Sequence, residues 1–147
     1  MALYRKGHYF VEDEMELFHG TNAQFERFSF DHAARPGMSG NGFLGIWLAV
    51  KRELAESFGS HCLVVKADIG RVYRMRISEL SRLNSDFNRC LPDGELTEEA
   101  VREAARQFYT RVRDDVIAQG FDAIEIVEED ERVEIVIGLD PERLSIQ

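Results

Sequence analysis

The chain has few cysteines, no long apolar run and no signal-like start, and each absence excludes a class of protein. Its two cysteines, Cys62 and Cys90, make no metal-spaced pattern; they could pair with each other, but free thiols are expected in a chain without a secretory signal. No stretch reaches the ~18 consecutive apolar residues of a membrane span. The segment Met1–Lys6 lacks the apolar run of a signal peptide. We therefore expect a soluble cytoplasmic protein with free, buried thiols and no metal; the alternative is an effector exported without a classical signal.

Prolines are also scarce, and no low-complexity linker or internal repeat divides the chain. The sequence has 147 residues, three of them proline, and is 44% hydrophobic, which suits one globular domain with a real core. We therefore expect a single domain over residues 1–147, in which residues 1–14 form an N-terminal extension.

Basic residues are outnumbered by acidic ones. The 18 Lys and Arg residues face 27 Asp and Glu residues, which gives a formal net charge of −9. Tight nucleic-acid binding rests on basic patches that displace counterions from phosphates. This balance disfavours non-specific binding to nucleic acids and to membrane surfaces.

The hydrophobic pattern predicts short strands with helices inserted between them. The expected strands cover residues 15–18, 43–50, 121–127 and 133–139, and segments 62–69 and 72–77 are expected to form one bent strand or a hairpin. The expected helices cover residues 51–58 and a long stretch that begins at the N-cap Thr97 and stops at Gly120. A polar, glycine-rich loop is expected at 31–42. Because strands and helices do not alternate regularly, we expect an α+β fold.

Three separated features combine residue types that suit ligand binding. At the end of the first strand, Phe18–Thr21 (Phe-His-Gly-Thr) can present an imidazole, an open backbone and a hydroxyl, although the same residues suit a turn. Gly45–Ala49 and Ala55–Phe58 bring aromatic side chains that equally suit a plain core. In the last strand, alternation sends Val133, Ile135 and Ile137 to one face and Glu134 to the other, where a carboxylate can also be a solvated edge residue.

In this order, the features resemble the motifs of the His-Tyr-Glu class of ADP-ribosyltransferases, which includes diphtheria-toxin-like and poly(ADP-ribose) polymerase catalytic domains. The resemblance is greatest to the small "ADP-ribosyltransferase in polyvalent proteins" type and spans residues 15–147. Its matching stretches are Phe18–Thr21, Gly45–Ala49, Ala55–Phe58, Gly120–Ile124, Glu134 and Asp140-Pro141. The resemblance implies a split antiparallel β-sheet core with a few inserted helices and NAD+ as co-substrate.

The resemblance also implies roles for individual residues in binding NAD+. His19 and Thr21 would contact the ribose hydroxyls, and the backbone of Gly20 would hold the nicotinamide carboxamide. Trp47 and Phe58 stand where the family has tyrosines, and their rings would sandwich the nicotinamide, which is cationic while bound to ribose.

The same resemblance makes Glu134 the catalytic residue and Arg35 a candidate for the diphosphate. Cleavage of the nicotinamide–ribose bond builds positive charge on the ribose, which a fixed carboxylate stabilises. The spacing from Glu134 to Asp140-Pro141 is one residue longer than the family pattern, so either a bulge absorbs the extra residue or a neighbour such as Glu131 is catalytic. Arg132 stands where arginine-modifying toxins carry Gln or Glu, so modification of arginine is not implied.

The implied function is mono-ADP-ribosyl transfer from NAD+ to an unknown acceptor, in a toxin, effector or regulator. Two alternatives stay open. The same residues would serve an NAD+ glycohydrolase, in which water is the acceptor. The substitutions at Trp47 and Phe58 also suit a catalytically inactive NAD+-binding or protein-interaction module of the same fold.

Overall fold

The computed structural model describes residues 15–30 and 40–147, which form one mixed, mostly antiparallel seven-stranded sheet with three α-helices. This confirms the α+β class. The elements are β1 (Met15–Thr21), the 3-10 helix η2 (Gly40–Leu44), β2 (Ile46–Ala49), α1 (Arg52–Glu56), β3 (His61–Ala67), β4 (Val72–Arg76), α2 (Ile77–Cys90), α3 (Glu98–Ala118), β5 (Ala123–Val127), β6 (Val133–Gly138), the 3-10 helix η3 (Pro141–Arg143) and β7 (Leu144–Ile146). The strand order is β4-β5-β6-β2-β1-β3-β7. The proposed N-terminal extension and most of the predicted loop lie outside the described residues.

Segments 62–69 and 72–77 do not form the predicted bent strand or hairpin. β3 pairs with β1 and β7, whereas β4 lies at the opposite edge of the sheet and pairs in parallel with β5. The start of β4 is tied to the start of β5 because the backbone N–H of Arg71 donates to Asp122 Oδ2 over 3.0 Å, and the N–H of Asp122 donates to the Arg71 carbonyl over 2.7 Å. The partner of β4 thus comes from far along the chain, which the local pattern does not show.

The strand predicted at 43–50 is shorter than expected. Phe43 and Leu44 belong to η2, where they are buried and pack with α3 in one apolar cluster, and the strand begins only at Ile46. Gly45 between them approaches the opposite strand closely, since a Cβ at this position would lie 2.5 Å from the carbonyl oxygen of Gly138. An apolar run alone does not distinguish a buried 3-10 turn from a strand.

The long helix α3 begins and ends where the sequence predicts. Thr97 is its N-cap, with Oγ1 accepting the N–H of Ala100 over 3.0 Å, and Gly120 follows the helix with a φ of 93°. The apolar residues of α3 face the sheet, and Ala105 and Val116 are buried there. The preceding helix α2 was not predicted; most of its residues are polar, and it is held by the buried Leu80 and Phe87.

Replacing Thr97 with Ala is expected to lower the free energy of unfolding by about 1 kcal/mol, because the N–H of Ala100 loses its acceptor. Urea denaturation measures this loss. The matched control is Thr97→Ser, which keeps the hydroxyl and should remain close to the wild type. Equal stability of the Ala variant and the wild type would show that the cap contributes nothing.

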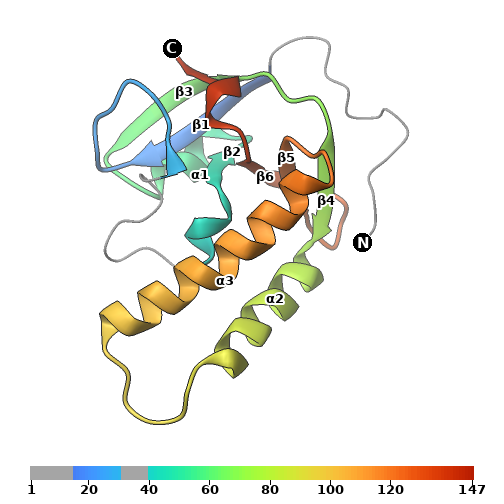
Figure 1. Ribbon diagram of the computed structural model, residues 1–147. Coiled ribbons are helices and arrows are strands. Elements are labelled where there is room, and N and C mark those ends of the chain that lie inside the picture. Colours follow the sequence, from blue (N-terminus) through green and yellow to red (C-terminus); the bar gives the residue numbers. More distant parts are fainter. Residues whose placement is uncertain (1–14, 31–39) are drawn as a thin grey trace.

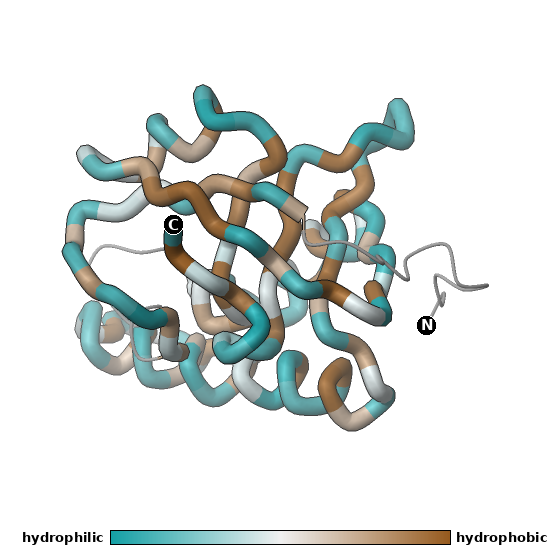
Figure 2. The backbone as a smooth tube through the Cα atoms, turned by 90° about the horizontal axis from the view of Figure 1, so that it is seen from above, coloured by the Kyte–Doolittle hydropathy of each residue, from teal (hydrophilic) through white to brown (hydrophobic). Residues whose placement is uncertain are grey.

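Two apolar clusters cover the two faces of the sheet. On the helix-side face, strand residues such as Ile124 and Ile137 pack with α2 and α3. On the far face, Leu17, Leu48 and Val136 pack with Phe28 from the segment after β1. Figure 1 shows α2 and α3 side by side, and the rings of Phe87 and Tyr109 pack between them with centroids 5.3 Å apart. Figure 2 shows hydrophobic stretches mainly inside the fold and hydrophilic ones mainly along its outer coils.

Both cysteines are free, as expected, but they are not buried, since Cys62 is half-buried and Cys90 exposed. Within residues 15–30 and 40–147, no helix is both long and apolar enough to cross a membrane.

Candidate functional site

The sheet topology places His19 and Glu134, the candidates for ribose binding and for catalysis, on one face of the sheet. β2 lies between β1 and β6, and the register pairs Phe18 with Ala49 and Ala49 with Ile135 (Figure 1). Paired residues share a face, and neighbours along a strand alternate, so His19, next to Phe18, belongs to the far face. Glu134 belongs to the same face, because it adjoins Ile135 and its carbonyl accepts the N–H of Val50, which follows Ala49. Their strands are two strand spacings apart, roughly 10 Å.

The imidazole of His19 is fixed at the point where β1 and β2 separate. The two strands pair at Phe18 and Ala49, and one residue further the His19 Nδ1 atom lies 2.8 Å from the carbonyl oxygen of Trp47. A carbonyl only accepts, so Nδ1 carries the proton and Nε2 is the nitrogen that accepts in the neutral ring. The ring also packs edge-on against Phe28 and Phe25, with centroids 5.1 and 6.0 Å away. This contact set orients the imidazole.

Gly20 and Thr21 have structural roles at the contact between β1 and α1. A Cβ at Gly20 would lie 1.8 Å from the carbonyl oxygen of Ala55, so only glycine lets α1 approach this strand. Thr21 is 3% exposed, and its Oγ1 accepts the backbone N–H of Ala23 over 3.1 Å. These contacts support the turn interpretation of this motif, and the ligand-binding interpretation stays a prediction.

Trp47 and Phe58 lie on the other side of the sheet from His19. The indole of Trp47 packs against the helix-side cluster, and its Nε1–H donates to the carbonyl of Asn41 over 3.2 Å. Phe58 follows α1, is 59% exposed and has its Cβ beside Gly20. The sheet lies between these aromatic side chains and His19. A single NAD+ molecule could therefore place its nicotinamide on the aromatic side chains and its ribose on His19 only at the point where β1 and β2 separate.

Glu134 lies at a β-bulge. Ile126 pairs with Ile135 and Val127 with Val133, so Glu134 has no partner of its own on β5. A bulge was one of the two explanations for the additional residue before Asp140-Pro141. It also corrects the predicted alternation, because Val133 packs with the far-face cluster while Ile135 joins the helix side.

The Glu134 carboxylate is accessible, whereas that of its neighbour Glu131 is engaged elsewhere. The side chain of Glu134 is 37% exposed, and its Oε1 lies 3.7 Å from an Arg132 nitrogen, while its carbonyl accepts the N–H of Val50 over 3.0 Å. Glu131 lies in the β5–β6 turn with a φ of 70°, and Arg76 donates two hydrogen bonds to it. These bonds lower the pKa of Glu131. Of the two carboxylates considered, Glu134 is the one that belongs to a strand next to β2, whereas Glu131 lies in the turn and is bound to Arg76.

A second carboxyl on the far face was missed by sequence reasoning. Glu125 lies in β5, whose residues are all buried, and it is itself only 7% exposed. It pairs with Arg74 of β4 and with Val136 of β6, and its Oε1 has no hydrogen-bond partner in the described part of the chain. Burial raises the pKa of this carboxyl, and the charge of Arg74 opposes that shift. The sequence feature that could have identified Glu125 is its place as a single glutamate inside an otherwise apolar strand.

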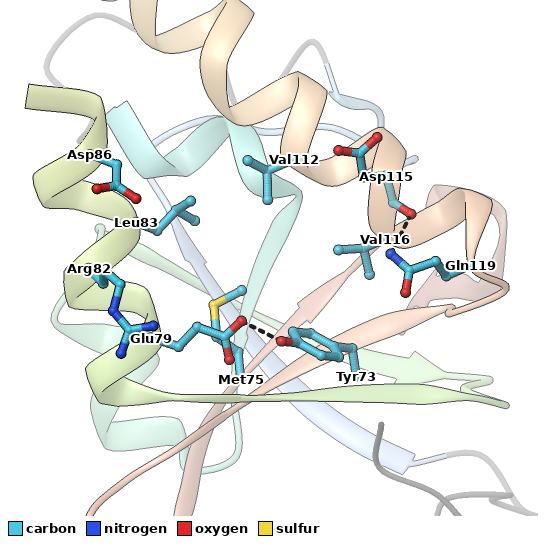
Figure 3. A pocket seen from close by; sticks show the side chains of 10 residues that line it. All are labelled: Tyr73, Met75, Glu79, Arg82, Leu83, Asp86, Val112, Asp115, Val116 and Gln119. Atoms are coloured by element: carbon cyan, nitrogen blue, oxygen red, sulfur yellow. Dashed lines mark hydrogen bonds between the residues drawn. The ribbon is translucent and has the colours of Figure 1, made fainter. Parts of the chain in front are cut away.

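A cavity of about 390 Å³ lies between α2, α3 and β4 (Figure 3). Leu83, Val112 and Val116 point into it, and the Tyr73 hydroxyl donates a hydrogen bond to Glu79 at its floor. Burial, followed by this contact with Glu79, raises the pKa of Tyr73 above its usual range. The cavity is on the helix side, and among the described residues none of those predicted for the NAD+ site lines it.

Arg35, the diphosphate candidate, lies outside the described residues. Across the described ranges, no three His, Cys, Asp or Glu side chains gather in an arrangement that could hold a metal ion.

No protein-family model matches the chain, and no curated protein matches its sequence. Among solved structures, one described as "Crystal structure of an anti-CRISPR protein" matches with 14% sequence identity and a TM-score of 0.46. The match covers 95% of this chain and 98% of that chain. At this identity and TM-score, the comparison carries no functional argument.

Proposed function

We propose that the protein is an NAD+-dependent mono-ADP-ribosyltransferase that cleaves the nicotinamide–ribose bond and transfers ADP-ribose to an acceptor. The proposal rests on one observation: His19 and Glu134, from opposite ends of the sequence, lie on the same sheet face on the two strands that flank β2. In such a pair, His19 can bind the ribose of NAD+, and Glu134 can place its carboxylate beside the ribose carbon that carries the nicotinamide.

The chemistry of the two side chains supports this assignment. With Nδ1 held by the Trp47 carbonyl, Nε2 of His19 can accept a hydrogen bond from a ribose hydroxyl. The half-exposed Glu134 carboxylate can stabilise the positive charge that develops on the ribose as nicotinamide leaves. The carbonyl of Glu134 accepts the N–H of Val50 at the end of β2, which holds the backbone that carries the carboxylate.

The divergence of β1 and β2 supports the finer assignment to an ADP-ribosyltransferase-like split sheet. These strands pair at Phe18 and Ala49 and then separate beside His19. The nicotinamide would lie at this separation, between the ribose on the far face and the aromatic side chains of Trp47 and Phe58 on the helix side. The backbone of Gly20 borders the same place.

The test is incubation of the purified protein with NAD+ labelled in its adenine, with and without a cell lysate. We expect nicotinamide to be released and the label to appear on one class of macromolecule. Free ADP-ribose without any labelled acceptor would identify a glycohydrolase instead. Calorimetric binding of NAD+ without nicotinamide release would identify a binding module, and absence of both binding and release would overturn the proposal.

A further inference from the structure

Glu125 occupies a position where every neighbour along its strand is apolar and buried. Its side chain is 7% exposed, and one carboxyl oxygen finds no donor among the described residues. Burying an unsatisfied carboxyl costs free energy that an apolar residue of similar size would not. Buried ionisable groups of this kind concentrate at functional sites.

The register places Glu125 next to Glu134. Glu125 pairs with Val136, and Glu134 precedes Val136 by two residues on the same face. In a regular antiparallel pair, diagonal neighbours of this kind are roughly 7–8 Å apart, and the bulge shifts Glu134 from the regular ladder position. Two glutamate side chains that start from such neighbouring positions can bring their carboxyl groups to the roughly 6.5–9.5 Å that separates the catalytic pair in inverting glycosidases.

The order of side chains across the far face gives the two carboxyls different positions. From β1 to β4, the row of this face that starts at His19 continues through Leu48 and Val136 to Glu125 and Arg74, and Glu134 lies two residues before Val136 on β6. If the ADP-ribose lies between His19 and Glu134, the reacting carbon is next to Glu134. A group that attacks this carbon from the side away from His19 then lies beside Glu125.

We propose that Glu125 is the proton acceptor for the attacking group, an assignment that rests on the proposed transferase function. The nicotinamide–ribose bond breaks, and its electron pair leaves with nicotinamide. The N–H or O–H nucleophile of the acceptor forms the new bond to the ribose carbon, and its proton moves to the Glu125 carboxylate. The charge and atoms of NAD+, acceptor and enzyme balance without any other reactant.

The groups that face Glu125 suit this role. Arg74 lies directly opposite on β4, Glu134 lies diagonally on β6, and Arg76, one pair further along β4, is bound to Glu131. Burial raises the pKa of Glu125, and the charge of Arg74 opposes that shift. Because a base acts when deprotonated, activity should rise as the pH rises through this pKa.

The experiment compares the pH dependence of nicotinamide release from NAD+, with water as the acceptor, in the wild type and in Glu125→Gln. The variant is expected to keep the wild-type KM for NAD+, to lose about 10² in kcat and to lose the rise of kcat with pH. Glu125→Asp should restore that rise at a reduced kcat. A Glu125→Gln variant with the wild-type kcat and pH profile would overturn the assignment.

The outcomes separate this inference from the proposed function. If the wild type releases no nicotinamide, the transferase proposal fails and the role of Glu125 falls with it, whereas an active wild type with an unaffected variant removes the role of Glu125 alone. If Glu125→Gln does not fold, the pKa of the Glu125 carboxyl is measured in the wild type by carbon NMR titration, and this pKa tests the assignment. A raised pKa supports the assignment, and an ordinary glutamate pKa rejects it.

Discussion

Replacing Glu134 with Gln is expected to lower the rate of nicotinamide release by roughly 10²–10³. Gln has nearly the same shape but carries no negative charge, so the positive charge on the ribose loses its counter-charge in the transition state. The folded structure should be retained, because the side chain is 37% exposed and its contact with Arg132 is a 3.7 Å surface pair, which contributes little to stability. Initial rates at saturating NAD+ measure the loss of activity, and the melting temperature measures whether the folded structure is retained.

The matched control for this variant is Glu129→Gln, which removes the same charge from an exposed position of the β5–β6 turn. Its rate should equal that of the wild type. If both variants lose activity equally, the effect is a general one of net charge. Full activity of Glu134→Gln, together with a large loss in Glu131→Gln, would move the catalytic role to the turn.

Replacing Gly20 with Ala is expected to lower the free energy of unfolding by about 3 kcal/mol or more. The added Cβ would lie 1.8 Å from the carbonyl oxygen of Ala55, which is a backbone atom and does not rotate away. α1 would have to move off β1, and Phe58 would move with it. Urea denaturation measures the loss of stability, and the KM for NAD+ should rise in any folded fraction.

A suitable control is Gly70→Ala, where the added Cβ would meet the Asp122 side chain at 2.7 Å. That carboxylate is a side-chain group that can shift at the cost of its hydrogen bond from Arg71, so a smaller loss of stability, about 1 kcal/mol, is expected. Equal losses in the two variants would show that α1 does not depend on the absence of a side chain at Gly20.

The features determined by the sequence alone are those that depend on near neighbours in the chain. α3 starts at Thr97 and stops at Gly120 because a cap, a period of 3.6 residues and a glycine act within a few residues of one another. The β5–β6 hairpin follows from two apolar strands around an acidic turn. The positions of His19 and Glu134 in the chain were likewise visible without any structure.

The tertiary structure alone decided which strands pair and which faces their side chains occupy. β4 pairs with β5 only after α2 and α3 have returned the chain to the sheet, so the predicted hairpin with β3 was wrong. The shared face of His19 and Glu134 depends on the register of both strands with β2, and a shift of one residue would send either side chain to the other face. The bulge at Glu134 has the same origin, because it arises from pairing with β5.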